Sequence, residues 1–141
     1  MKEGVRILVA YDDSGQSKKA LQSSLAIARR FNGSMSVLRI FPFEPGDSNV
    51  TLEERTKRRE ERLQKLTREV KTIIEGSGVP YEVRAEHGDD VSSIIVEDAR
   101  RGRFDLIAIG NRGFSGVKEL LSGSISHEVI AKAHCDVLVT K

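Results

Sequence analysis

The chain has 141 residues, and its 23 Lys and Arg residues are nearly balanced by 21 Asp and Glu residues, which leaves a formal net charge of +2. This length fits one domain, residues 1–141, with a sizeable core. The balanced charge gives no argument for nucleic acid or an anionic membrane as a partner. A single Cys excludes an intrachain disulfide framework. Because no apolar run reaches membrane-spanning length and no signal peptide fits before the first strand, we expect a soluble, cytoplasmic domain.

Strand and helix patterns alternate along the whole chain. Apolar residues recur every three to four positions in the expected helices, whereas buried strands read as nearly continuous apolar runs. In order, the predicted elements are a strand at residues 5–10, a helix capped by Ser14 or Ser17 and closed by Asn32-Gly33, a strand at 35–41, a helix at 52–75, a strand at 79–85, a helix capped by Asp89 or Asp90 and closed at Gly102, a strand at 104–109, a helix at 125–133 and a strand at 137–140. We expect Gly33 to adopt the left-handed conformation that ends its helix.

The order of the strands in the sheet follows from these patterns. Strands that alternate with helices imply a parallel sheet with helices on both faces. The strand at residues 79–85 alternates in polarity and carries Pro80, which places it at an edge. Crossover connections between parallel strands are right-handed, so helices can cover both faces only if the direction of strand addition reverses once. With the third strand at an edge, the strand order 3-2-1-4-5 follows. Asp12, after the first strand, and Gly110, at the end of the fourth, then meet at the reversal, where such sheets bind ligands.

A glycine-rich segment follows the fourth expected strand. Gly110, Gly113 and Gly123 separate that strand from the last helix, which begins near Ser124. Glycine lets the main chain approach a ligand closely, and a helix N-terminus offers N–H groups that suit phosphate. The segment has neither the Walker nor the Rossmann spacing. It is therefore either a plain connecting loop or a phosphate-binding segment, and its position at the reversal favours binding.

Three motifs resemble the ATP-binding branch of the universal stress protein family, and the resemblance covers nearly the whole chain. They are the run Ile-Leu-Val-Ala-Tyr-Asp-Asp-Ser from Ile7 to Ser14, the spacing Gly110-x2-Gly113-x9-Gly123-Ser124, and the terminal Cys135-Asp136-Val137-Leu138-Val139. The chain departs from the family at Asp136, where many members have Pro. The resemblance implies a single-domain adenine nucleotide α-hydrolase-like fold with flavodoxin-like layering, and a homodimer built through the last strand.

The resemblance also implies nucleotide contacts for individual residues. Asp12 would contact the ribose, and the main chain of Ile40 would meet the adenine. The other implied contacts, along the ribose and the phosphates, are Ile109, Gly110, Arg112, Gly113, Gly123, Ser124 and Ile125. The implied ligand is ATP with Mg²⁺, and the sequence does not rank AMP and ADP against it. No metal-ligating residue is predicted.

The glycine spacing favours a nucleotide-dependent regulator or switch, and the family resemblance implies a role in a stress response. No nucleophile–base pair can be identified, and Asp13 is the nearest candidate for a water-activating base, so no catalytic residue is predicted. A slow ATPase or phosphotransferase stays open as an alternative. A receiver-like phosphoacceptor domain is a further alternative, since Asp12 and Asp13 form an acidic pair after the first strand. However, no Asp stands at the tip of the third strand, where Glu86 and His87 lie.

The last expected strand, residues 137–140, gives a second reason to expect association. It contains no charged residue and no Pro that would protect a sheet edge. Because an apolar edge invites pairing with a second copy, we predict a homodimer through this strand.

Overall fold

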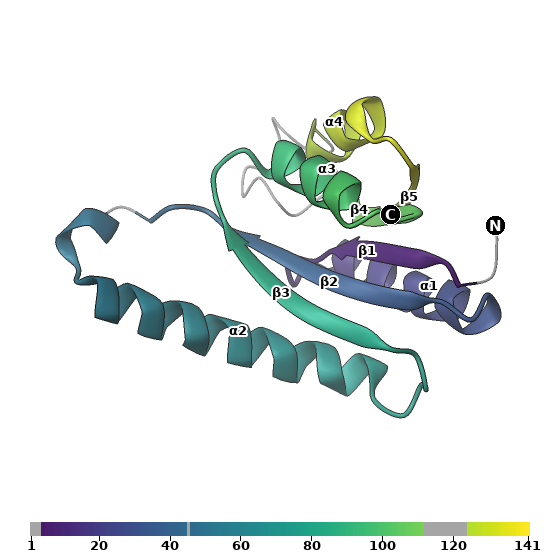
Figure 1. Cartoon of the computed structure of the whole chain (residues 1–141), viewed down its shortest axis with the longest axis horizontal. Coiled ribbons are helices and arrows are strands. Elements are labelled where there is room, and N and C mark those ends of the chain that lie inside the picture. Colours follow the sequence, from purple (N-terminus) through teal and green to yellow (C-terminus); the bar gives the residue numbers. More distant parts are fainter. Residues whose placement is uncertain (1–3, 45, 112–123) are drawn as a thin grey trace.

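The computed structural model describes residues 4–44, 46–111 and 124–141, and Figure 1 shows their arrangement. The elements are β1 (Arg6–Ala10), α1 (Gly15–Arg30), β2 (Ser34–Phe41), a 3₁₀ turn (Asp47–Asn49), α2 (Leu52–Ile74), β3 (Tyr81–His87), α3 (Val91–Arg101), β4 (Leu106–Gly110), α4 (Ser124–Lys132) and β5 (Asp136–Thr140). The strands form one five-stranded parallel sheet in the order β3-β2-β1-β4-β5, which confirms the predicted order. Within the described ranges, no helix is long and apolar enough to cross a membrane.

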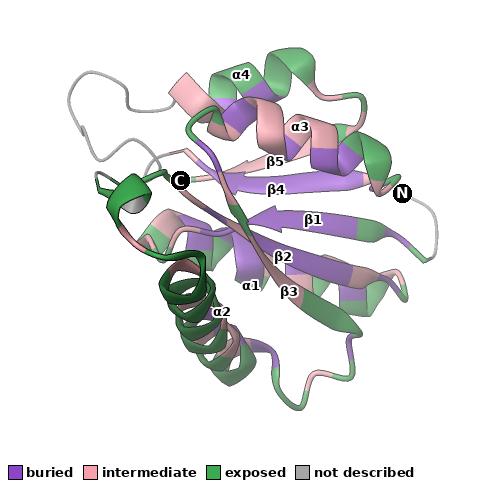
Figure 2. Cartoon of the chain, turned by 60° about the vertical axis from the view of Figure 1, so that its left-hand side comes forward, coloured by how far each residue is buried: buried purple, intermediate pink, exposed green. Residues whose placement is uncertain are grey.

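The helices cover the sheet in two layers, with α1 and α2 on one face and α3 and α4 on the other (Figure 2). The central strand β1 contributes to both cores. Ile7 and Val9 pack with α1 and α2, whereas Leu8 and Ala10 pack with α3 and α4. All four side chains are almost completely buried. This two-sided burial explains why the first strand reads as a continuous apolar run.

The register places the reversal of the sheet at the carboxyl end of β1. Ala10 lies opposite Leu38 of β2 on one side and opposite Ile109 of β4 on the other. The chain segments that leave β1 and β4 therefore begin side by side. The strand order also excludes the receiver alternative, because receiver domains of the CheY type have the order 2-1-3-4-5.

Several element ends differ from the prediction. β3 runs two residues later than predicted, because the alternating pattern continues past residue 85 to His87. The left-handed residue after α1 is Asn32, with φ 51°, and not Gly33. Gly33 is needed for another reason, since a Cβ there would lie 2.6 Å from Cγ1 of Val5 and would also collide with the Val5 carbonyl oxygen. After α3 the left-handed residue is Arg103, with φ 53°.

Candidate functional site

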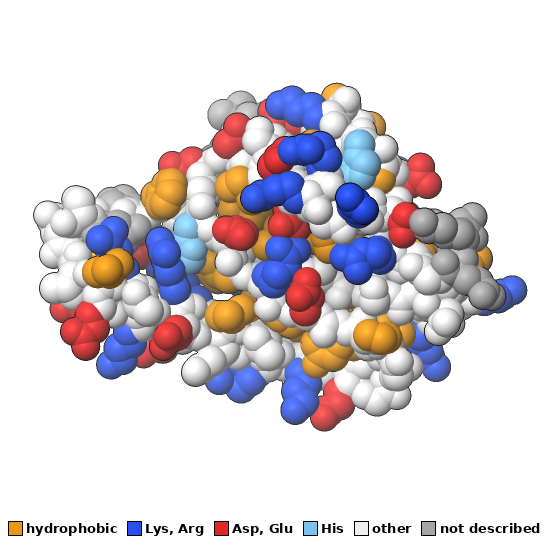
Figure 3. Space-filling model, in the orientation of Figure 1, with side chains coloured by type: hydrophobic (Ala, Val, Ile, Leu, Met, Phe, Trp, Pro, Cys, Tyr) orange, Lys and Arg blue, Asp and Glu red, His pale blue; other side chains and the backbone are white. Residues whose placement is uncertain are grey.

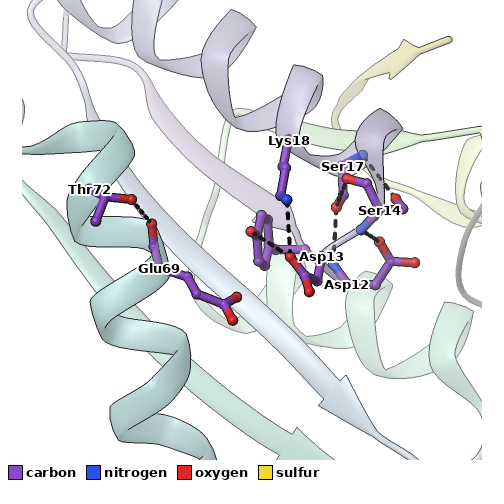
Figure 4. Close-up of polar contacts among 8 residues, drawn as sticks. Asp12, Asp13, Ser14, Ser17, Lys18, Glu69 and Thr72 are labelled. Carbon is purple, nitrogen blue, oxygen red and sulfur yellow. Dashed lines mark hydrogen bonds and ion pairs between the residues drawn. The ribbon is translucent and has the colours of Figure 1, made fainter.

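Asp12 follows β1 and is held in place by the first turn of α1 (Figure 4). Its Oδ1 accepts a hydrogen bond of 2.9 Å from the main-chain N–H of Ser14. Its own N–H donates to the Oγ of Ser17, which is completely buried, at 3.3 Å. Ser14 is the helix cap, because its Oγ accepts from the Ser17 N–H at 3.1 Å. The same turn therefore starts the helix and orients the Asp12 carboxylate.

Two buried oxygen atoms at this edge have no hydrogen-bond partner among the described residues. They are Oδ2 of Asp12 and Oδ1 of Asn111. A buried acceptor without a donor costs about 1–3 kcal/mol, so such atoms are uncommon in native proteins. Asn111 is fixed through its main chain, whose N–H donates to the Thr140 carbonyl at 2.9 Å. The edge thus presents two acceptors that a ligand with hydroxyl or amino groups can satisfy.

Ile40 can offer only its main chain to a ligand. Its side chain is 7% exposed and belongs to the core beneath α3 and α4. Two residues earlier, the Leu38 carbonyl accepts from the Tyr11 N–H at 2.9 Å, so the main chain of Leu38 is directed toward β1. Alternate residues of a strand point their main-chain groups to the same neighbour. The main chain of Ile40 is therefore directed to the β1 side, beyond the point where β1 has ended.

Ile109 and Gly110 end β4 at the same edge. The Ile109 side chain is completely buried, so only its main chain is available. A Cβ on Gly110 would lie 2.7 Å from Cβ of Gln16, 2.9 Å from its carbonyl carbon and 3.0 Å from N of Ser17. The close packing of α1 on β4 therefore requires glycine at position 110, whether or not a ligand binds there.

Ser124 and Ile125 form the first turn of α4. In Figure 2, α4 begins on the side of the molecule where the strands end. Ile125 packs against the core beneath α3 and α4. The structure thus brings Asp12, Ile40, Gly110 and this helix N-terminus to one edge of the sheet. The remaining predicted site residues lie outside the described residues: Arg112, Gly113 and Gly123.

The Asp13 side chain points toward Lys18, whereas that of Asp12 lies at Ser14 (Figure 4). Its backbone is left-handed, with φ 71°, and its Oδ1 lies 3.3 Å from Nζ of Lys18. The same oxygen accepts from the Tyr11 hydroxyl at 3.5 Å. Burial, and then the nearby Asp13 charge, raise the pKa of Tyr11 to about 12. The Asp12 carboxylate thus bonds to Ser14, whereas the Asp13 carboxylate pairs with Lys18.

A cavity of about 400 Å³ lies beside the first turn of α4. It is lined by Asp89, Asp90, Val91, Ser92, Ile125 and Glu128. Hydrogen bonds from Ser93 hold the pKa of Asp90 below its usual range, so this wall is anionic at neutral pH. The described residues contain no group of three or more His, Cys, Asp or Glu side chains that could hold a metal ion.

Sequence reasoning misses two contributors to this site. The role of Ser17 is hidden because Ser14 and Ser17 both fit the pattern of a helix cap, and only the structure shows that Ser17 bonds to the Asp12 main chain. Asn111 stands between the predicted residues Gly110 and Arg112, and its position directly after a buried strand is the signal that could have identified it.

These features define a parallel α/β protein with its candidate ligand site at the reversal of the sheet. The chain belongs to the universal stress protein family, whose sequence model matches residues 5–141.

Individual relatives match over nearly the whole chain. A universal stress protein of Thermus aquaticus is 32% identical over 136 residues, which cover 96% of this chain and 97% of the relative. One from Methanocaldococcus jannaschii is 30% identical over 139 residues, covering 96% and 81%. Among solved structures, a universal stress protein of Lactobacillus plantarum matches with a TM-score of 0.81 at 20% identity, with 100% of both chains covered. That last likeness concerns the fold alone.

Proposed function

We propose that this protein binds an adenine nucleotide at the carboxyl edge of its sheet and acts in the cytoplasm as a nucleotide-dependent regulator in a stress response. The observation that carries the proposal is the buried Oδ2 of Asp12, which has no partner among the described residues and lies at the reversal of the sheet. A ribose hydroxyl is a donor that would satisfy this oxygen. In the ligand-bound protein, the main chain of Ile40 would then face the adenine.

The phosphates would lie toward α4. The unpaired N–H groups of a helix N-terminus and its partial positive charge stabilise phosphate. Ser124 and Ile125 would supply such groups, and we expect Arg112, Gly113 and Gly123 to complete this end of the site. The anionic cavity wall next to Ile125 would repel a triphosphate. We therefore propose that ATP binds together with Mg²⁺, which neutralises part of the phosphate charge.

Two solved family structures support the ligand class. A universal stress protein that matches this fold with a TM-score of 0.74 at 22% identity, over 97% of both chains, was solved in complex with cAMP. One from Archaeoglobus fulgidus, with a TM-score of 0.67 at 22% identity and 100% coverage of both chains, was solved in complex with dAMP. We carry over adenine-nucleotide binding from these proteins, and ATP as the ligand of this chain is our own proposal.

Thermal melts with AMP, ADP and ATP, each with and without Mg²⁺, test this function. A ligand that binds only the folded state stabilises it by RT ln(1 + [L]/Kd), so the melting temperature should rise with nucleotide concentration. We expect ATP to shift it most strongly when Mg²⁺ is present. A melting temperature that stays constant up to millimolar concentrations of all three nucleotides would exclude the proposed site. Phosphate release over hours then separates a regulator from a slow ATPase.

We also propose that the protein forms a homodimer through β5. This strand lies at the edge of the sheet, and its side chains from Val137 to Thr140 are only half buried in the single chain. Pairing with a second copy would satisfy the outward main-chain groups of the edge. Sedimentation at micromolar concentration should give twice the mass of one chain. A wild-type monomer would refute this arrangement.

A further inference from the structure

The two helices that cover one face of the sheet carry most of the positive charge of the chain. α1 contains four basic residues and no acidic residue, and α2 contains eight basic and five acidic residues. The two helices therefore have an excess of seven positive charges. The rest of the chain, with eleven basic and sixteen acidic residues, has an excess of five negative charges. The formal net charge of +2 hides this asymmetry, although three of those acids, Asp13, Glu44 and Glu75, form ion pairs with cations of the two helices.

The two helices share one layer of the molecule. Both lie on the same face of the sheet (Figure 2). Leu21 of α1 and Leu66 and Val70 of α2 belong to the same core cluster. Because the apolar stripes of both helices point to the sheet, their charged sides point to solvent. We call the outward-facing surface of α1 and α2 the basic layer.

Within α2 the charges are least balanced toward the end of the helix. Arg62, Lys65, Arg68 and Lys71 recur at every third position, and Glu69 is the one acidic residue among them. The Glu69 charge contributes to raising the pKa of Tyr11, which places this carboxylate near the polar cluster between the two helices. Arg62 pairs with Glu44 and Lys71 with Glu75, so Lys65 and Arg68 are the unpaired cations of this half of α2 among the described residues.

Several exposed cations of the basic layer have no acidic partner within the described parts of the chain. Among them are Arg29, Arg30, Lys65 and Arg68. The guanidinium carbon of Arg30 lies 5.8 Å from the centroid of the Phe31 ring. Unpaired surface cations are free to bind an anion without first giving up an ion pair.

The opposite face of the molecule also carries ion-paired cations. Arg84 of β3 binds both carboxylate oxygens of Asp98, at 2.8 and 2.6 Å. Arg100 and Arg101 both pair with Glu97. Figure 3, in the orientation of Figure 1, shows the side of the molecule where α2, β3 and α3 lie, and Lys and Arg side chains lie there among Asp and Glu side chains. On the opposite face, Arg103 and Lys132 have no acidic partner among the described residues, and on the basic layer Lys18, Arg62 and Lys71 are paired, so paired and unpaired cations occur on both faces.

We propose that the basic layer binds the phosphate backbone of a nucleic acid. A basic surface gathered on one face is the electrostatic pattern of nucleic-acid binding, in which each neutralised phosphate releases bound counterions. Seven of the twelve cations of the two helices are Arg, whose planar fork matches phosphate oxygens. The proposal does not depend on the nucleotide site, because that site lies at the carboxyl edge of the sheet.

An anionic membrane surface fits the basic layer less well. Helices that lie on membranes insert an apolar face into the lipid. Here the apolar stripes of both helices are buried against the sheet. Among the described residues, Leu52 is the one large, exposed apolar side chain of these two helices, and it stands at the very start of α2. The surface thus offers charge without an apolar anchor.

The test compares two variants of equal net charge. The basic-layer variant carries Arg29→Gln, Arg30→Gln, Lys65→Gln and Arg68→Gln. The control carries Arg100→Gln, Arg101→Gln, Arg103→Gln and Lys132→Gln, four exposed cations on the side of α3 and α4. Fluorescence anisotropy measures binding to a labelled duplex DNA and a single-stranded RNA, and cosedimentation measures binding to phosphatidylcholine vesicles that contain phosphatidylserine. Circular dichroism melts establish that both variants are folded.

We expect the wild type and the control to bind nucleic acid at low salt. If about four phosphates are neutralised, raising the salt from about 50 to 200 mM should weaken duplex binding about a hundredfold. The basic-layer variant should lose most of its affinity and of this salt dependence. Equal losses in both variants would mean that only net charge matters, and would overturn the proposal. So would the absence of binding to both nucleic acids, or binding to vesicles alone.

Discussion

Replacing Asp12 by Asn is expected to weaken adenine-nucleotide binding about 10- to 100-fold while leaving the fold intact. The Asn side chain can still accept the hydrogen bond from Ser14 through its remaining oxygen. However, Asn has an amide nitrogen in place of Oδ2 of Asp12, the charged oxygen that is buried at the reversal of the sheet. A hydrogen bond to a charged group contributes about 1.5–3 kcal/mol, which corresponds to this loss of affinity. Isothermal titration with AMP and with Mg-ATP measures the effect.

Asp13→Asn is the matched control for this substitution. It removes the same charge at the next residue, and Asn tolerates the left-handed backbone of position 13. Because the Asp13 carboxylate is directed to Lys18, this variant should keep nucleotide affinity within about twofold, since exposed ion pairs contribute little. Equal losses in the two variants would show that Asp12 acts only through its charge and not through contact with the nucleotide.

Gly110→Ala is expected to destabilise the protein by about 1–3 kcal/mol, the usual cost of overpacking a well-packed site. The new Cβ would lie 2.9 Å from the carbonyl carbon of Gln16 and 3.0 Å from N of Ser17. These are backbone atoms of the first turn of α1, so they cannot move aside as a flexible side chain would. Urea unfolding, followed by circular dichroism, measures the change in the free energy of unfolding.

Gly15→Ala serves as the comparison. It adds the same methyl group to the first turn of α1, the turn that Gly110 contacts from β4. A Cβ on Gly15 would have no atom within 4 Å, and Ala favours a helix over Gly by up to about 1 kcal/mol. We therefore expect this variant to be as stable as the wild type or slightly more stable. If Gly110→Ala were equally harmless, the packing of α1 on β4 would not be the reason for glycine at position 110.

Much of the fold was predictable because its determinants are local. The apolar run before Asp12 indicates a central strand, and the alternating, proline-containing pattern of the third strand indicates an edge strand. Because crossover connections are right-handed, few strand orders are then possible. Helix ends were less predictable. Asn32 and Arg103 adopt the left-handed conformation although each has a Gly beside it. The need for glycine at position 33 comes from its close contact with Val5. This contact joins residues that are distant in sequence.

The candidate site was predictable in position but not in detail. Chain order alone brings Asp12 and Gly110 to one edge. Asp12 and Asp13 have different hydrogen-bond and ion-pair partners because the backbone of Asp13 is left-handed. No pattern of residues in the sequence predicts this conformation. The charge asymmetry is a different case, because counting charges helix by helix would have shown it in the sequence. The total charge conceals it by summing two faces that only the structure separates.

The central position of β1 has a consequence for how the chain folds during synthesis. Ile7 pairs with Met35 on one side but with Leu106 on the other. The half-sheet of β1, β2 and β3 can assemble with α1 and α2 early, whereas Leu8 and Ala10 are fully covered only after α3 and α4 have packed on them. Contacts between such distant residues slow folding and leave apolar surface exposed in the meantime. A nascent chain that pauses before β4 is complete would therefore be the form most in need of a chaperone.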